Sequence, residues 1–207
     1  MSSNRRDFLK KVSATAAGVV VGGTAMGMSA KSYGKILGAN DRIHVGIVGL
    51  GRRLGAFISP VSAKANNVEL VYLCDVMKSQ REKAAKVFSE HINYSPKLEN
   101  DQRKLIDDPK VDAIFNAAPD HWHTPGAILG IVGGKHVYVE KPASHNMFEN
   151  ELIVDAQKKY NKVVQMGIQQ RSSDHTIEII NEIHNGIIGT PYKAVAFYSN
   201  ARGASPV

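Results

Sequence analysis

The sequence predicts an α/β protein built on a doubly wound parallel sheet, followed by the start of a second, truncated α/β domain. Three observations support this fold class. Short apolar runs alternate with amphipathic segments from residue 42 onward, a glycine-rich turn follows the first run, and an acidic residue follows the second. Near-continuous apolar strands that alternate with helices are typical of a parallel sheet covered on both faces.

The apolar runs, several of them rich in β-branched residues, are expected to be strands. They span residues 43–48, 68–74, 111–118, 136–140 and 163–166. Helices are expected over residues 79–88, 124–134 and 147–160. For the second helix, we expect Thr124 to be the cap, Pro125 to occupy the first helical position, and Gly133-Gly134 to end the helix.

A new unit is expected to begin after Gly167. A helix at about residues 176–184 and a strand at about residues 192–198 would be its first elements. We therefore expect one complete domain over residues 42–167 and the incomplete beginning of another over residues 168–207.

Composition narrows the class of protein. A chain that is 43% hydrophobic and 22% charged is an ordinary globular one. The net charge of +7 owes +3 to the first 30 residues, and no Lys/Arg run follows, which argues against a nucleic-acid partner. The single cysteine, Cys74, excludes an internal disulfide and a multi-cysteine metal site.

Residues 1–30 are similar to an export signal. Arg5-Arg6 precede Phe8-Leu9, and residues 12–30 carry no charge but are too weakly apolar for a stable membrane anchor. The arginine pair resembles the twin-arginine signal, an address for export of folded proteins, so we expect a periplasmic protein. A frayed cytosolic helix is the alternative. Residues 31–41 are expected to be a linker.

The turn after the first strand carries the first chemical signal. Glycines at this point let a pyrophosphate approach bare backbone at a helix N-terminus. Such turns are common, so this signal alone is weak. The residues expected to bind a nucleotide here are Gly49, Leu50, Gly51, Arg52 and Arg53.

Asp75 strengthens the nucleotide hypothesis. It lies 24 residues after Gly51, at the end of the second strand, where a carboxylate accepts hydrogen bonds from the adenosine ribose. A carboxylate there would repel a 2′-phosphate, so NAD is expected in preference to NADP. The alternative is a surface acid that only ends a strand.

Two further patterns lie where strands end, at the edge that faces the ligand in such folds. Residues 117–123 read Ala-Ala-Pro-Asp-His-Trp-His, and we expect His123 near the nicotinamide and no metal site. Glu140-Lys141-Pro142 follows the strand at 136–140. Lys141 is placed to hydrogen-bond a substrate hydroxyl and assist its proton transfer; a Glu140–Lys141 salt bridge is the structural alternative.

These motifs, in this order, resemble the Gfo/Idh/MocA family of nicotinamide-dependent sugar oxidoreductases over residues 42–207. The resemblance implies an N-terminal Rossmann domain and a C-terminal α/β domain that supports the substrate and the oligomer interface. It implies catalytic roles for Lys141 and His123. The residues then expected to contact the cofactor are Gly49, Leu50, Gly51, Arg52, Arg53, Asp75, Pro119, His123, Glu140 and Lys141.

Two departures from the family pattern stand out. Leu54 occupies the place where a third glycine often lies, which bears on helix packing after the turn. The family's second domain supplies a catalytic histidine, and neither His175 nor His184 matches that motif. The chain is therefore expected to be the N-terminal part of the enzyme.

The leading functional hypothesis is an exported NAD-dependent oxidoreductase that acts on a sugar or polyol and forms a homo-oligomer when full length. One alternative is a glycoside hydrolase that works by transient oxidation, although relatives of that kind often lose the lysine of Glu140-Lys141-Pro142. Another alternative is a nucleotide-binding fragment without turnover. Sugar-dependent cofactor reduction, sugar release without net reduction, or binding alone would separate the three.

Changing Arg5 and Arg6 together to lysine should trap the protein in the cytoplasm, because the export receptor reads paired guanidinium groups and not charge alone. Fractionation of cells that express either version measures this. Equal periplasmic amounts of the two versions would mean that the leader follows the general secretion route.

Overall fold

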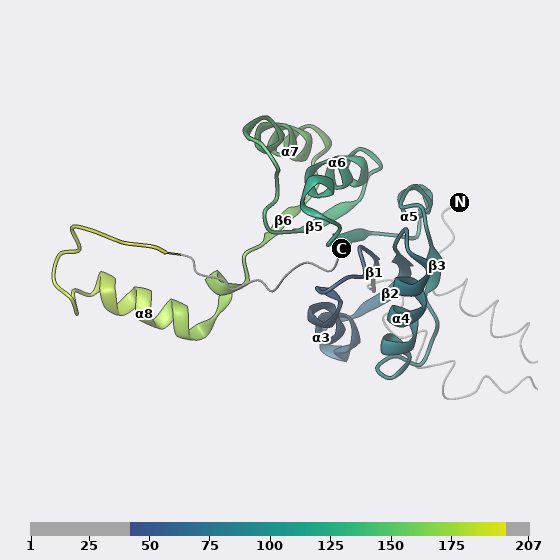
Figure 1. The fold of residues 1–207 in the computed structure, drawn as a ribbon, viewed down its shortest axis with the longest axis horizontal. Helices are drawn as coiled ribbons and strands as arrows, with labels where there is room; N and C mark the ends of the chain where they lie inside the picture. Colours follow the sequence, from purple (N-terminus) through teal and green to yellow (C-terminus); the bar gives the residue numbers. More distant parts are fainter. Residues whose placement is uncertain (1–41, 198–207) are drawn as a thin grey trace, which may run out of the picture. The chain divides into compact units, whose positions relative to one another are not determined.

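The computed structural model describes residues 42–197 of the 207-residue chain (Figure 1). The expected export signal and linker, residues 1–41, lie outside the described residues, as do residues 198–207.

Six parallel strands form one sheet in the order β3-β2-β1-β4-β5-β6 (Figure 1). The strands are β1 (Ile43–Val48), β2 (Val68–Cys74), β3 (Lys97–Glu99), β4 (Ala113–Asn116), β5 (His136–Glu140) and β6 (Val164–Gly167). From β1 to β3 the chain adds strands on one side of β1, and from β4 to β6 it adds them on the other side. The loops after β1 and β4 therefore run in opposite directions at the carboxyl edge of the sheet. This is the Rossmann arrangement, and it confirms the predicted fold class.

Helices connect the strands. The α-helices are α3 (Ile58–Ser62), α4 (Lys78–Ser89), α5 (Arg103–Asp107), α6 (His123–Val132), α7 (Met147–Tyr160) and α8 (Asp174–His184). Short 3-10 helices are η2 (Leu54–Phe57), η3 (Lys64–Asn66), η4 (Asp120–Trp122) and η5 (Gln169–Ser172). None of the described helices combines the length and apolarity needed to cross a membrane.

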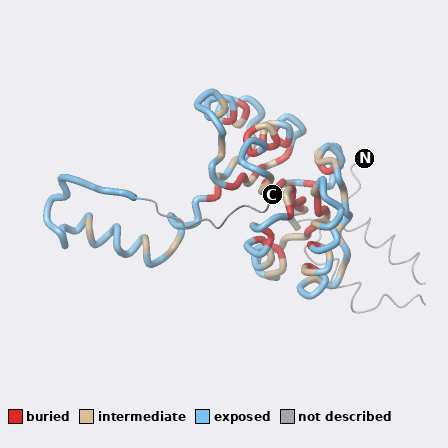
Figure 2. Tube along the Cα trace, in the orientation of Figure 1, coloured by how far each residue is buried: buried red, intermediate tan, exposed pale blue. Residues whose placement is uncertain are grey.

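Buried residues lie on the strands and on the helices beside them (Figure 2). They form three apolar clusters that pack the helices onto the sheet. Phe88 of α4 and Phe57 of η2 pack with the apolar residues of β1 and β2. Leu105 of α5 packs with Tyr72 and Ile114 in the second cluster. The third cluster joins α6 and α7 to β5. Burial of these side chains fixes the strand ends and therefore the loops at the carboxyl edge.

Several expectations need correction. Residues 191–197 form no strand, and Tyr192 and Phe197 are almost fully exposed, so the strand expected at 192–198 is absent over its described part. Thr124 does not cap α6, which begins one residue earlier; its hydroxyl instead donates to the Ala143 carbonyl at 2.7 Å. A strand needs a neighbour for its backbone groups, and no described segment pairs with residues 191–197.

The segment after the glycine turn also differs from the expected helix. It begins as the 3-10 helix η2, and only five residues of α-helix follow in α3. Leu54, in the place of the third glycine, is buried in the core under the turn. The short strand β3, with two exposed residues, was not predicted, because three residues give no readable alternation.

Candidate functional site

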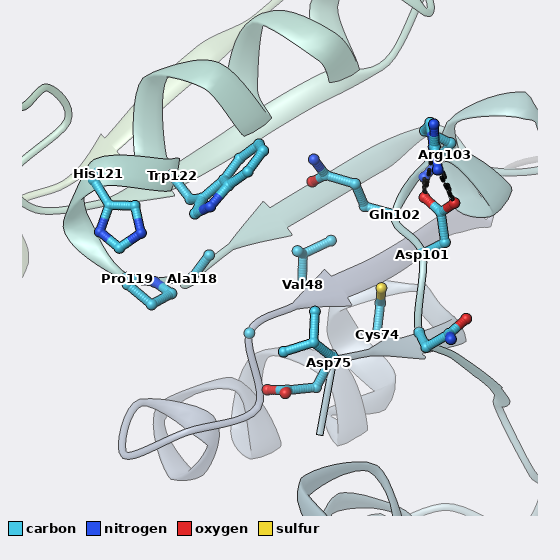
Figure 3. A pocket seen from close by; sticks show the side chains of 13 residues that line it. Val48, Cys74, Asp75, Asp101, Gln102, Arg103, Ala118, Pro119, His121 and Trp122 are labelled. Atoms are coloured by element: carbon cyan, nitrogen blue, oxygen red, sulfur yellow. Dashed lines mark hydrogen bonds and ion pairs between the residues drawn. The ribbon is translucent and has the colours of Figure 1, made fainter. Parts of the chain in front are cut away.

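A cavity of about 630 Å³ opens at the carboxyl edge of the sheet (Figure 3). Its walls come from the ends of β1 and β2, the loop after β3, and the segment after β4. Gly49, Asp75 and Pro119, all predicted site residues, line it. Arg53, Glu140 and Lys141 are not among its described lining residues. The predicted site residues therefore fall into two groups.

Gly49 sits where no other residue fits. Its φ is +86°, and a Cβ atom there would overlap the Ala117 carbonyl and the Ala118 backbone. Its own N–H donates to the Cys74 carbonyl at 2.9 Å. Gly51 is exposed with open space around it. Bare backbone thus faces the cavity edge, as pyrophosphate binding requires.

Asp75 ties the end of β2 to the glycine turn. One carboxylate oxygen accepts from the Leu50 N–H at 2.8 Å, and the other accepts from the Met77 N–H at 2.9 Å. Each carboxylate oxygen can accept two hydrogen bonds, so capacity remains for ribose hydroxyls. Leu50 contributes through its backbone, because its side chain is buried in the core. The guanidinium of Arg81 donates to the Asp75 and Val76 carbonyls, the former at 2.5 Å.

The second group of residues surrounds the carboxylate of Glu140, which is only 5% exposed at the end of β5. One of its oxygens accepts from Arg53 Nε at 2.6 Å, Gln169 Nε2 at 2.9 Å and the Tyr138 hydroxyl at 3.0 Å. We call Arg53, Tyr138, Glu140 and Gln169 the Glu140 cluster. It joins the glycine turn, β5 and the segment after β6.

The pKa values in the Glu140 cluster follow from this geometry. Burial alone would raise the pKa of Glu140, but the hydrogen bonds from Arg53 and Tyr138 outweigh burial and hold the pKa below its ordinary value. Burial and the adjacent carboxylate raise the pKa of Tyr138, so its hydroxyl keeps the proton that it donates. Glu140 is therefore an ionised carboxylate that holds Arg53 and Gln169 in place through one of its oxygens.

Lys141 is left unpaired by this arrangement. Its side chain is exposed, and its ammonium group makes no hydrogen bond or ion pair with any residue in the described range 42–197. Only its backbone N–H approaches Glu140, at 3.3 Å. Glu140 pairs with Arg53 instead, so the Glu140–Lys141 salt bridge considered from the sequence does not form. The Lys141–Pro142 peptide bond is cis.

His123 lies in the interior, 2% exposed. Its Nε2 is 2.8 Å from the Ala118 carbonyl oxygen, and its Nδ1 is 2.5 Å from the Pro142 carbonyl oxygen. The ring thus bridges the segment after β4 and the turn that follows Lys141. In this arrangement His123 positions the two segments and does not itself reach the cavity.

Two further features concern metal and thiol chemistry. Within the described residues, no group of three or more His, Cys, Asp or Glu side chains lies together as a metal site would require. Cys74 lines the cavity, and burial, with help from nearby carboxylates, raises the pKa of its thiol to about 12. A thiol with this pKa is a weak nucleophile at neutral pH.

Sequence reasoning missed the Glu140 cluster as a unit. Arg53 and Glu140 are 87 residues apart, and Gln169 lies 29 residues beyond Glu140. No local spacing connects such positions. Trp122, which lines the cavity, was not singled out either; its place in the segment that follows β4 was the available signal.

A sequence model of the Gfo/Idh/MocA group, described as an oxidoreductase family with an NAD-binding Rossmann fold, matches residues 43–168. This segment is more than half of the chain. It contains the glycine turn, Asp75, the segment after β4 and the Glu140-Lys141-Pro142 turn.

Individual proteins show the same relationship. A glycosyl hydrolase family 109 protein of Saccharopolyspora erythraea is 28% identical over 200 residues, which cover 90% of this chain and 43% of that protein. An inositol 2-dehydrogenase of Salmonella paratyphi B is 26% identical over 160 residues, covering 77% and 46%. The chain spans less than half the length of these relatives.

Among solved structures, scyllo-inositol dehydrogenase from Lactobacillus casei with bound NAD(H) and scyllo-inositol matches with a TM-score of 0.63 at 23% identity. The match covers 72% of this chain and 42% of that one. This likeness shows a shared fold.

Arg53→Met should destabilise the protein by about 1–3 kcal/mol at pH 7, because the buried Glu140 carboxylate loses its charged donor while water reaches the partly exposed position of Arg53. In the native protein the pKa of Glu140 is lowered from its ordinary value of 4.5, so its ionised form stabilises the fold above that value, and this stabilisation is lost as the pH falls through the lowered pKa. In the variant, burial raises the pKa, so ionisation costs stability as the pH rises. The gap in melting temperature should therefore widen from pH 4 to pH 7.

The matched control is Arg52→Met, which removes an exposed arginine from the same turn. Its melting temperature should stay near the native value at every pH. A gap for Arg53→Met that does not change with pH would contradict the charge assignment.

Proposed function

Because the chain belongs to the Gfo/Idh/MocA family of oxidoreductases and carries its NAD-binding Rossmann domain, we propose that it is the cofactor-binding part of a dehydrogenase that acts on a secondary alcohol of a sugar or polyol. The inositol 2-dehydrogenase relative supports a hydroxyl-rich substrate of this kind. The dehydrogenase as a whole would be longer than this chain, because the relatives are.

The observation that carries the proposal is the unpaired ammonium of Lys141. From the sequence, Lys141 would be expected to pair with the adjacent Glu140, but Glu140 forms its ion pair with Arg53 instead. Lys141 is thus held at the carboxyl edge of the sheet with its donor groups available. A substrate hydroxyl at this edge could hydrogen-bond to Lys141. The side chain would accept the hydroxyl proton as its neutral amine when hydride leaves the same carbon, and as the ammonium it would return that proton in the reverse reaction.

The chain offers a fitting site for the cofactor. The bare backbone at Gly49 and Gly51 suits a pyrophosphate, and the carboxylate of Asp75 suits the adenosine ribose. When bound, NAD supplies the hydride acceptor. Arg53, held by Glu140, keeps the glycine turn against β5, and His123 keeps the Lys141 turn against the segment after β4.

A second candidate function is glycoside cleavage by transient oxidation. It is favoured by the family 109 relative, the match that covers 90% of this chain. The exposed Lys141 favours simple dehydrogenation. Release of sugar without net cofactor reduction would support the second candidate, and cofactor reduction that depends on the sugar would support the first.

Export to the periplasm by the twin-arginine route and assembly into a homo-oligomer complete the proposal.

Asp75 should give a preference for NAD over NADP, because its carboxylate repels a 2′-phosphate. Asp75→Asn removes the charge with little change in shape. The ratio of the dissociation constants for NADP and NAD should fall by about 10-fold, or roughly 1.4 kcal/mol. Titration of both nucleotides at one ionic strength measures this. Asp120→Asn, an exposed acid outside the cavity lining, is the control and should leave the preference unchanged. Tighter binding of NADP to the native protein would contradict the assignment.

Lys141→Ala in the complete enzyme should lower turnover by about 10²–10⁴-fold, the usual range for general acid–base assistance. NAD affinity should fall far less, because Gly49, Gly51 and Asp75 lie on other loops. The melting temperature should hardly change, since the ammonium has no described partner. Lys158→Ala, an exposed lysine on α7, is the control. Near-normal turnover of Lys141→Ala would remove Lys141 from the proposed mechanism.

A further inference from the structure

Trp122 is the only tryptophan of the chain, and its side chain is not part of the core. It is 46% exposed and lines the cavity. None of the described ring–ring contacts involves it. A half-exposed indole without a ring partner has an aromatic face on which a planar group can stack.

The backbone of Trp122 is firmly held although its side chain is free. Its N–H donates to the Pro119 carbonyl at 2.7 Å, and its own carbonyl accepts from the Asn116 side-chain amide at 3.1 Å. Asn116 is itself 1% exposed, at the end of β4. The 3-10 helix η4 is therefore a rigid support that presents the indole to the cavity.

Gln102 enters the same cavity from the loop after β3. Figure 3 shows the indole of Trp122 and the amide of Gln102 directed toward one another. The Gln102 carbonyl accepts from the Leu105 and Ile106 N–H groups, both at 3.1 Å, so its backbone is also fixed. Its side-chain amide has no hydrogen-bond partner among the residues that the structure describes.

The position of the cavity matches the adenosine end of a Rossmann dinucleotide site. Asp75 lies in its wall, and an acid in this position binds the adenosine ribose in Rossmann domains. Val48, Val76 and Pro119 add an apolar lining. A planar ring, an apolar lining and one free amide are what a purine base needs: a surface for stacking and a partner for its polar edge.

We propose that Trp122 stacks on the adenine base of the cofactor and that the Gln102 amide hydrogen-bonds its edge. Adenine presents a donor at N6 beside an acceptor at N7, and a glutamine amide matches both. The assignment rests on the proposed function, because it needs a dinucleotide in this site. It adds a base-recognition role to two residues, Trp122 and Gln102, that were not among the site residues predicted from the sequence.

The sole tryptophan makes the assignment directly measurable. ADP-ribose, which carries the adenine but not the nicotinamide, should quench Trp122 fluorescence as the base stacks on the indole. Nicotinamide mononucleotide, which lacks the adenine, should leave the emission nearly unchanged. Nicotinamide hypoxanthine dinucleotide, whose O6 acceptor replaces the N6 donor, should bind more weakly than NAD because the amide can no longer make both hydrogen bonds.

Variants separate stacking from simple apolar packing. Trp122→Leu should raise the dissociation constant for NAD by about 10- to 100-fold, in line with the measured worth of base–aromatic stacking. Trp122→Phe should keep it within about 3-fold of native, because the aromatic face remains. Both variants should melt near the native temperature, because the hydrogen bonds at Trp122 come from its backbone.

Two results would overturn the assignment while leaving the proposed function intact: native NAD affinity in Trp122→Leu, or equal quenching by ADP-ribose and nicotinamide mononucleotide. Failure of the native protein to bind NAD at all would overturn the proposed function, and the adenine assignment with it. The two failures are therefore distinguishable in one set of titrations.

Discussion

The buried carboxylate of Glu140 is the constraint on which this site depends. An ionised group that is 5% exposed is tolerated only if donors surround it, and three side chains supply them here. Arg53 must come from the glycine turn and Gln169 from beyond β6, so the need for donors draws distant segments together. The same need removes Glu140 as a partner for Lys141 and leaves that ammonium available.

Tyr138 extends this constraint into the core. Its ring lies 5.9 Å from that of Phe57 and 5.7 Å from that of Phe115, both in edge-on contacts, while its hydroxyl donates to Glu140. Phe57 belongs to η2, directly after the glycine turn. Tyr138 thus stabilises the glycine turn in two ways. Its ring packs against Phe57, and its hydroxyl donates to the carboxylate that pairs with Arg53. Gly167 leaves the room for this hydroxyl, since a Cβ atom there would overlap it.

The sequence predicted the central sheet well, because most of its strands are apolar runs bounded by turns. The ranges 43–48, 68–74 and 136–140 and the helix over 147–160 agree with the structure at both ends. The helix is bounded by local signals, with Asn146 as its cap and Asn161 in the left-handed conformation that ends it. The strand expected near residue 195 failed because apolar alternation says nothing about whether a neighbouring strand is present.

The site was predictable only where its chemistry is local. Gly49 and Asp75 lie at strand ends, and a parallel sheet brings the carboxyl ends of its strands to one edge. Their placement at one cavity therefore follows from the order of the strands along the chain. The partner of Glu140 was not predictable. The adjacent Lys141 was the natural choice by sequence, whereas the actual partner depends on how far the glycine turn reaches across β4 toward β5. Side-chain reach of this kind is a property of the packed fold.

The separation of Arg53 from Glu140 also has a consequence for the order of events during synthesis. A ribosome adds about 5–20 residues per second, so the 87 residues between the two take on the order of 4–17 s to make. Throughout that interval the glycine turn exists without the carboxylate that holds its arginine. The nascent chain therefore has its nucleotide loop long before it has the means to fix that loop in place, and Gln169 completes the arrangement later still.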